Sequence, residues 1–70
     1  MQINRQALTV AMAKLGFDFV RLSRESGISR TTLSYIHNGK FCKPATVGKL
    51  AKALQIPVES LVEKGDMPNG

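Results

Sequence analysis

Four residues near the middle of the chain combine hydrogen-bonding groups with a helical spacing. Arg30, Thr31 and Thr32 directly follow Ser29, and Tyr35 lies about one helical turn further on. Serine is a preferred helix cap, so we expect Ser29 to begin a helix whose first side chains project outward. An arginine pairs bidentately with the O6 and N7 atoms of guanine, and a threonine contacts a thymine methyl group. The positive end of the helix dipole also favours a polyanion at this point.

Each of these residues has a purely structural alternative. Arg30 could be a solvated arginine at a helix start, although the helix dipole disfavours a cation there. Thr31 and Thr32 could be ordinary surface residues of a helix. Tyr35 could contact a base or the DNA backbone, or it could shield the edge of the core.

A helix-turn-helix unit over residues 18–38 is expected to position these side chains. Gly27 supplies the positive φ that a tight corner requires. Ser23 is small, which lets the two helices approach closely. Ile28 and Leu33 are expected to point inward and set the angle between the helices.

The spacing of apolar residues predicts an all-α fold with five short helices and no strand. The expected caps are Asn4, Asp18 and Ser29, and glycines follow three of the helices. The expected core consists of leucines and an isoleucine at helical spacing. The predicted helices cover residues 5–15, 19–26, 30–38, 44 or 45 to 54, and a last segment beginning at Pro57; the predicted core residues are Leu8, Leu22, Leu33, Ile36, Leu50 and Leu54.

The length and charge of the chain narrow the functional classes. Seventy residues form one domain that is too small for a catalytic cleft around a substrate. Residues 1–56 hold nine basic and two acidic side chains, a net charge of +7. Residues 57–70 hold one basic and three acidic side chains, a net charge of −2, so the formal net charge of the chain is +5. A basic body indicates a nucleic-acid partner or, equally, a solvated surface. On the second helix, Arg21 and Arg24 are open to the same two interpretations.

The remaining reactive residues do not form a recognisable centre. His37 and Cys42 are the chain's single histidine and cysteine, which is too few ligands for a closed metal site. Cys42 could be a redox-sensitive thiol or a passive loop residue. We therefore expect no enzyme activity and no cofactor. With one cysteine, no long apolar run and no secretory leader in the first twenty residues, we expect a cytoplasmic protein without a membrane partner.

The segment Leu22-Ser23-Arg24-Glu25-Ser26-Gly27-Ile28-Ser29-Arg30-Thr31-Thr32-Leu33-Ser34-Tyr35-Ile36 resembles a known family. With Asn38-Gly39-Lys40 and Lys49-Leu50-Ala51-Lys52-Ala53-Leu54 downstream, the chain is similar over roughly residues 4–63 to the Cro/CI-type (XRE-like) helix-turn-helix domains of phage repressors and bacterial regulators. The resemblance implies a compact five-helix bundle of the lambda-repressor-like type. We expect residues 1–65 to form this domain and residues 66–70 a flexible tail.

The resemblance also implies two sets of DNA-contacting residues. The base-reading set is Arg30, Thr31, Thr32 and Tyr35. The phosphate-contacting set lies at the start of the second helix, on the third helix and in the loop after it, and consists of Asp18, Phe19, Ser29, Ser34, Asn38, Lys40, Phe41 and Lys43. The chain departs from the family at Phe19, where members often carry a glutamine that braces the recognition helix, and at Met12, where members often carry arginine.

These residues imply a sequence-specific regulator of transcription that binds a double-stranded DNA operator and acts as a repressor. Relatives generally bind as homodimers, and we expect a dimer surface from the loop after the third helix and from Val58, Leu61 and Val62. The same fold serves antitoxins, so the alternative is a protein-interaction module that also binds its own operator. Phe19 and Phe41, if exposed, would suit such a protein partner.

Overall fold

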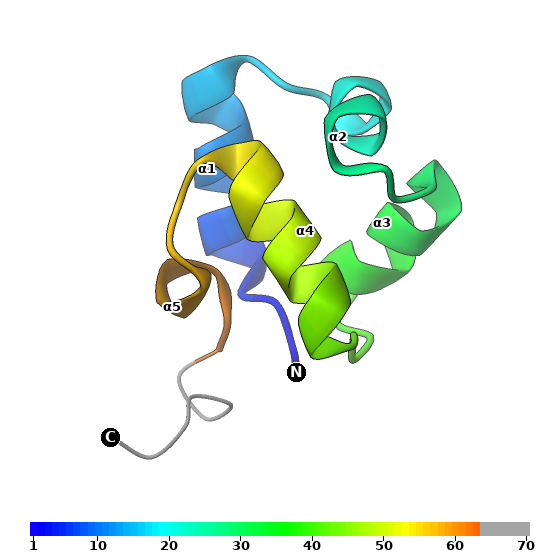
Figure 1. The fold of residues 1–70 in the computed structure, drawn as a ribbon, viewed down its shortest axis with the longest axis vertical. Helices are drawn as coiled ribbons and strands as arrows, with labels where there is room; N and C mark the ends of the chain where they lie inside the picture. Colours follow the sequence, from blue (N-terminus) through cyan, green and yellow to red (C-terminus); the bar gives the residue numbers. More distant parts are fainter. Residues whose placement is uncertain (64–70) are drawn as a thin grey trace.

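Five helices account for most of residues 1–63, which are the residues that the computed structural model describes. They fold into a bundle in which α4 lies at the centre, with α1 and α5 on one side and α2 and α3 on the other (Figure 1). This arrangement confirms the predicted all-α bundle. The helices are α1 (Arg5–Leu15), α2 (Phe19–Ser26), α3 (Arg30–His37), α4 (Pro44–Leu54) and α5 (Val58–Leu61).

The first three helices begin at the predicted caps. The side chain of Asn4 accepts the backbone N–H of Ala7 at 2.8 Å, and that of Asp18 accepts the N–H of Arg21 at 2.8 Å. Each bond satisfies a backbone donor that the helix itself leaves unpaired. The polar residues between the apolar stripes therefore determine where the helices start.

The core lies where α4 meets the helices around it. α4 packs against α1, α2 and α5, and α2 packs against α3. All six leucine and isoleucine positions predicted from the sequence are buried. The buried hydrophobic residues are Ile3, Leu8, Ala11, Leu22, Ile28, Leu33, Ile36, Val47, Leu50, Ala51, Leu54, Leu61 and Val62.

The corner between α2 and α3 has the geometry expected for a helix-turn-helix unit. Gly27 adopts φ +75°, and its N–H donates to the carbonyl of Ser23 at 2.9 Å. This left-handed conformation is one that residues with a side chain adopt only at a cost. Beyond the corner, Ile28 and Leu33 are buried and fix α3 against the rest of the molecule.

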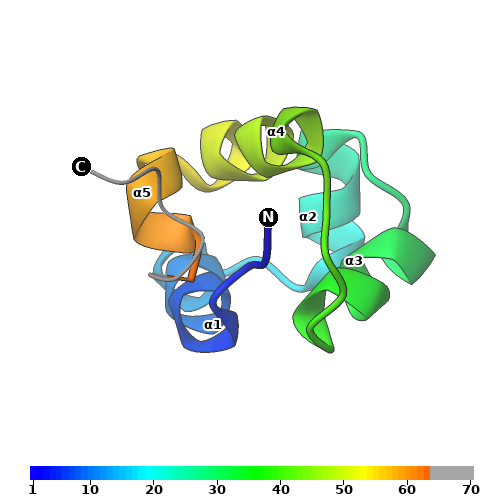
Figure 2. The same cartoon turned by 90° about the horizontal axis from the view of Figure 1, so that it is seen from below.

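The first four residues form an unexpected extended segment between two distant parts of the chain. Gln2 makes a single antiparallel bridge with Phe41, and Ile3 makes another with Val62 (Figure 2). Within residues 1–63 these pairings remain single bridges and do not grow into a strand, in line with the predicted absence of strands. The segment nevertheless connects the loop after α3 to the residues after α5.

Several boundaries differ slightly from the predicted ones. Asn38 caps α3 instead of belonging to it, and Pro57 caps α5 instead of lying in its first turn. α4 ends at Leu54 as predicted, and its C-cap, Gln55, adopts the left-handed conformation with φ +59°, which nothing in the sequence signals. The predicted domain end at residue 65 and the predicted tail over residues 66–70 lie outside the described residues.

Candidate nucleic-acid interface

The first turn of α3 is held by Ser29. Its hydroxyl oxygen accepts the backbone N–H of Thr32 at 3.2 Å and donates a hydrogen bond to the hydroxyl of Thr32 at 2.9 Å. The residues that follow this cap, Arg30 and Thr31, are exposed. Since the first turn of α3 contains no acidic residue, the positive end of the helix dipole lies open at the surface. This is a suitable arrangement for binding an anion.

The two faces of α3 differ sharply. Leu33 and Ile36 point into the core and are 0% and 2% exposed, whereas Tyr35 is 55% exposed. One side of α3 therefore anchors the helix, and the other is available to a partner. The helix is not covered by any other helix on this outer side within residues 1–63, as Figures 1 and 2 show.

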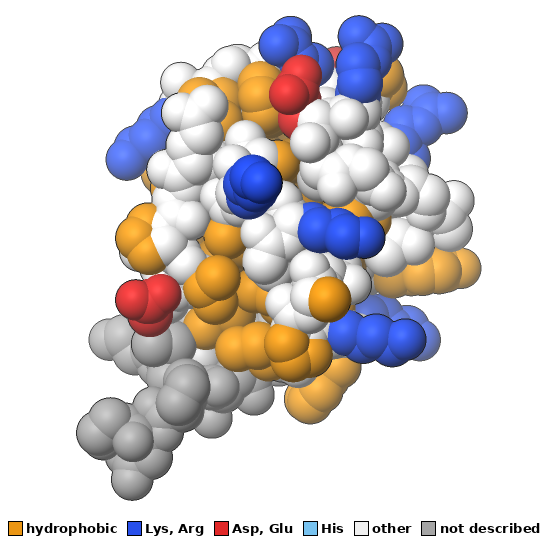
Figure 3. Space-filling model, viewed as in Figure 1, with side chains coloured by type: hydrophobic (Ala, Val, Ile, Leu, Met, Phe, Trp, Pro, Cys, Tyr) orange, Lys and Arg blue, Asp and Glu red, His pale blue; other side chains and the backbone are white. Residues whose placement is uncertain are grey.

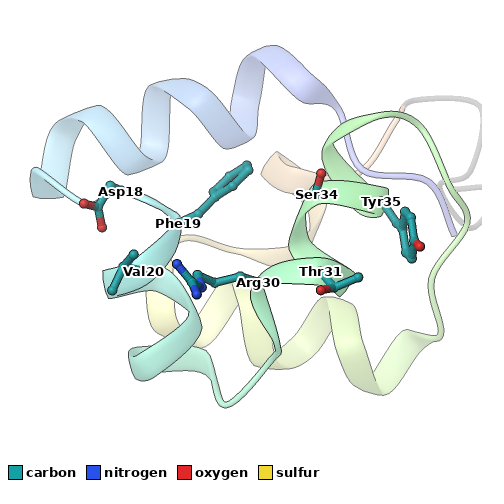
Figure 4. Close-up of a pocket in the computed structure, with 7 residues that line it drawn as sticks. All are labelled: Asp18, Phe19, Val20, Arg30, Thr31, Ser34 and Tyr35. Carbon is teal, nitrogen blue, oxygen red and sulfur yellow. The ribbon is translucent and has the colours of Figure 1, made fainter.

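An open groove of about 630 Å³ runs between the start of α2 and the outer face of α3. In Figure 4, Arg30 extends from α3 toward the start of α2, while Tyr35 points away from the helix at the other end of the groove. Three of the four predicted base-reading residues line this groove together. The lining residues are Asp18, Phe19, Val20, Arg30, Thr31, Ser34 and Tyr35.

The fourth predicted base-reading residue, Thr32, lies on the other side of Tyr35. There it borders a second groove of about 370 Å³ formed by α3, the loop after it and the start of α4. Tyr35 borders both grooves, so the two are adjacent. Residues 32, 35, 36, 40–43 and 46 line this second groove, and they include the predicted phosphate contacts Lys40, Phe41 and Lys43.

Phe19 connects the start of α2 to the end of α3. Its ring packs against the ring of His37 in an edge-on arrangement, with 5.6 Å between the ring centres. It is half-buried, so it is not the freely exposed aromatic residue that the protein-partner alternative expected. Phe41 is exposed as expected, to 73%. Phe19 thus contacts α3 through ring packing, at the position where family members often carry a hydrogen-bonding glutamine.

The basic side chains around α3 are largely unpaired. Within residues 1–63 the one ion pair joins Arg21 to Glu25, on successive turns of α2, at 2.9 Å. Lys40 lies with its Nζ 5.8 Å from the centre of the Tyr35 ring. In the view of Figure 3, most Lys and Arg side chains lie at the upper and right-hand margins, and others lie at the left margin and near the centre of the face. Among the residues that line the grooves, Arg30 stands with Asp18 in the first, and Lys40 and Lys43 give the second a positive charge.

A family model for the Cro/C1-type HTH DNA-binding domain matches residues 7–63. The chain belongs to this family. The Cro/C1-type match spans α2 and α3 and continues through α5, so it includes both grooves. The resemblance that the sequence suggested is thereby confirmed.

Two relatives from Bacillus subtilis (strain 168) are similar to this Cro/C1-type domain. One is named the HTH-type transcriptional repressor RghR and is 50% identical over 46 residues, which cover 63% of this chain and 34% of the relative. The other is named the uncharacterized HTH-type transcriptional regulator RghRB and is 50% identical over 44 residues, or 60% of this chain and 32% of the relative. The matched region thus spans about a third of each relative. No solved structure is significantly similar to the chain.

The predicted dimer surface of this Cro/C1-type domain needs correction. Leu61 and Val62 were expected on that surface, but they are 0% and 5% exposed and belong to the core. Val62 is buried because it pairs with Ile3, and Val58 packs partly against the same core. Leu61 and Val62 are therefore not available to a second copy, and the loop after α3 is the part of the predicted surface that stays exposed.

Sequence reasoning missed two features of the Cro/C1-type domain. Val20 lines the groove beside Arg30, although its position on α2 did not single it out. Ile3 belongs to the core, and its position before the cap Asn4, with Leu8 as the fourth helical residue, matches a hydrophobic staple. That pattern was the signal that could have found Ile3.

Among residues 1–63, no three His, Cys, Asp or Glu side chains lie close enough together to hold a metal ion. Within the same residues, none of the helices has the length and apolar character that a membrane crossing requires.

Proposed function

We propose that this domain is a sequence-specific double-stranded DNA-binding regulator of transcription that acts as a repressor. The observation that carries the proposal is the exposed, capped start of α3, with Arg30, Thr31 and Tyr35 along one open groove. A helix that enters the major groove presents base-reading side chains from its first turns. The repressor role is supported by the name of the relative RghR.

The proposed base contacts divide between the two grooves. Arg30 has no carboxylate partner within residues 1–63, so its guanidinium is free to pair with a guanine. Thr31 and Tyr35 would contact bases or their methyl groups from the same groove. Thr32 would contact DNA from the second groove, and its bond to Ser29 keeps its side chain in one orientation.

The proposed phosphate contacts surround the base-reading side chains. Lys40 and Lys43 supply positive charge from the loop after α3, and the backbone N–H groups at the starts of α2 and α3 supply further donors. The Asp18 carboxylate already accepts the N–H of Arg21, so any contact from Asp18 would come from its backbone. The complete proposed set is Asp18, Phe19, Ser29, Ser34, Asn38, Lys40, Phe41 and Lys43.

We propose a homodimer on DNA, because one domain of about 33 × 22 × 18 Å carries a single recognition helix. Two such helices would read two half-sites about one helical turn apart. Sedimentation with the bound duplex tests this stoichiometry, and one protomer per site would contradict it. The proposal requires no cofactor and no enzymatic step, and it places the domain in the cytoplasm together with its operator.

The exposed ring of Phe41 favours a second candidate function. Phe41 is 73% exposed, and aromatic residues are enriched in protein–protein interfaces. The domain would then be an antitoxin-type interaction module that also binds its own operator. A toxin gene beside the gene for this chain would favour this candidate over the first.

Selection of bound sites from random DNA duplexes tests the first proposal most directly. We expect a defined site to emerge and to bind far more tightly than random DNA. With several phosphates neutralised, affinity for this site should fall about a thousandfold between 50 and 200 mM salt. If no sequence is enriched and affinity is insensitive to salt, the proposal is wrong.

A further inference from the structure

Two side chains from the beginning of the chain donate hydrogen bonds to the turn that follows α3. The Nε2 of Gln2 donates to the carbonyl of Gly39 at 2.6 Å, and the Nε of Arg5 donates to the carbonyl of His37 at 2.9 Å. Both acceptors are backbone carbonyls at the point where α3 ends and the basic loop begins. The turn is thus held from outside by residues more than thirty positions away in sequence.

Gly39 lies directly beside the side chain of Gln2. Gly39 adopts φ +98°, and a Cβ at this position would lie 3.4 Å from the Nε2 of Gln2. Glycine tolerates this left-handed backbone, which places the Gly39 carbonyl where Gln2 can donate to it. A backbone hydrogen bond also joins this loop to the start of the chain: Cys42 donates its N–H to the carbonyl of Met1 at 2.7 Å. The loop from Gly39 to Cys42 therefore lies along the first residues of the chain.

The opposite edge of the same segment is fixed to the core. Asn4 donates its N–H to the carbonyl of Leu61 at 2.8 Å, and Glu63 donates its N–H to the carbonyl of Gln2 at 2.9 Å. Between these bonds, the side chain of Ile3 is 3% exposed. The segment is consequently a firm support for the loop, since moving it would expose Ile3 and break backbone hydrogen bonds.

We propose that Gln2 and Arg5 are positioning residues for DNA binding. They hold the turn after α3 so that Lys40 and Lys43 lie beside the recognition helix before DNA arrives. A loop that is already ordered loses less conformational entropy when it binds, so its contacts contribute more to affinity. This inference rests on the proposed DNA-binding function. It adds residues outside the region matched by the family model, which begins at residue 7.

Replacement of Gln2 is the informative test because Gln2 carries no charge. In the full chain bound to its selected duplex, Gln2→Ala should weaken binding by about three- to tenfold. It should also reduce the slope of log affinity against log salt by about one to two, since each lost phosphate contact removes about 0.9. Gln6→Ala is the matched control, because Gln6 lies exposed on α1 beside Glu59 and Ser60 and away from the turn. It should bind DNA like the parent.

A double-mutant cycle shows whether Gln2 acts through the lysines. Once Lys40 and Lys43 are both replaced by alanine, Gln2→Ala should cause no further loss of affinity. Arg5→Ala should behave in the same way. If the loss from Arg5→Ala adds fully to that of the lysine variants, Arg5 contacts phosphate directly and its positioning role is wrong.

Amide hydrogen exchange in the free protein provides an independent measurement. Gln2→Ala, and Gln2→Met as a variant of similar size, should speed exchange at the Cys42 amide and leave the Leu33 and Leu50 amides protected. Unchanged exchange at Cys42, or parent-like affinity and salt slope in both variants, would overturn the inference. If the parent itself binds no duplex, the proposed function fails, and exchange at Cys42 still shows whether Gln2 holds the loop.

Discussion

The hydroxyl groups of Ser29 and Thr32 are hydrogen-bonded at 2.9 Å, at the end of α3 that we propose enters the DNA groove. The same Ser29 oxygen accepts the backbone N–H of Thr32. One side chain thus stabilises the start of the helix and orients a neighbouring polar side chain. Ser29 therefore contributes to the stability of α3 and, in the proposed function, to DNA binding. Substitutions at Ser29 can change one of these contributions without the other.

Replacing Ser29 separates the cap from the DNA contact. Ser29→Ala removes the cap and should lower the free energy of unfolding by about 1 kcal/mol, or about 4–8 °C in Tm for a domain of this size. Ser29→Asp retains a capping oxygen and should keep Tm near that of the parent. However, it adds negative charge next to the DNA backbone and should weaken binding by at least about tenfold. Thermal denaturation and duplex titration measure the two effects, and tight binding by Ser29→Asp would contradict the proposed orientation of α3.

Arg30 and Lys43 should differ in how they affect specificity. Arg30→Ala should relax the preference at one base position, at a cost of about 1–3 kcal/mol for the preferred sequence. Lys43→Ala should weaken binding to all sequences alike and reduce the salt slope by about one. The measurement is affinity for the selected duplex, for single-base variants and for random DNA.

Lys14→Ala serves as the charge-matched control for these two variants. Lys14 lies near Ile56 and Ser60, on the α1 and α5 side of the molecule. Its loss should change binding to either kind of DNA only slightly. If Arg30→Ala and Lys43→Ala behave identically on specific and random DNA, the division into base and phosphate contacts is wrong.

Two glycines should respond in opposite directions to the same substitution. A Cβ at Gly27 or at Gly48 would meet no atom within 4 Å, so crowding does not distinguish them. Gly27 has φ +75°, and Gly27→Ala should cost about 1–2 kcal/mol because side chains disfavour this conformation. Gly48 is inside α4, and Gly48→Ala should stabilise the domain by about 1 kcal/mol.

Gly27→Val should unfold the domain or destabilise it more severely than Gly27→Ala. Thermal or urea denaturation tests this, and a Tm for Gly27→Val within a few degrees of the parent would refute it.

Gln55 offers a way to stabilise the domain. It holds φ +59° at the end of α4 and is exposed. Gln55→Gly should raise the stability by about 1 kcal/mol, since glycine adopts this conformation without strain. Gln55→Ala, which retains the strain, should leave stability nearly unchanged and is the control. A gain of equal size in both variants would mean that the glutamine side chain, and not the backbone, is unfavourable.

Local signals in the sequence were sufficient to predict the helices and the corner. Asn4, Asp18 and Ser29 cap the helices because each has a short polar side chain in front of an apolar stripe. Gly27 marks the corner because the required backbone conformation is costly for other residues. These effects act over a few residues, so one sequence is enough to detect them.

The pairings between distant segments were not predictable from the same signals. The segment from Met1 to Asn4 is too short for a periodic pattern, and its partners lie near residues 39–42 and 61–63. Because this pairing was unknown, Leu61 and Val62 were assigned to a dimer surface when they are part of the core. The end of α4 at Leu54 was predicted, but the left-handed backbone of the next residue was not, because Gln55 adopts a conformation that its residue type does not favour.

Because Ile3 is buried, the folded domain begins before the region that matches the family model. Similarity to the family model begins at residue 7, yet the folded core extends upstream to include Ile3 and its bridge to Val62. A fragment cut at residue 7 would retain every helix residue from Ala7 onward and the whole recognition surface. It would lose Ile3 from the core and, with Gln2 and Arg5, the hydrogen bonds that hold the turn at the end of α3, so the truncation would loosen the loop beside the recognition helix although it removes no residue of either groove.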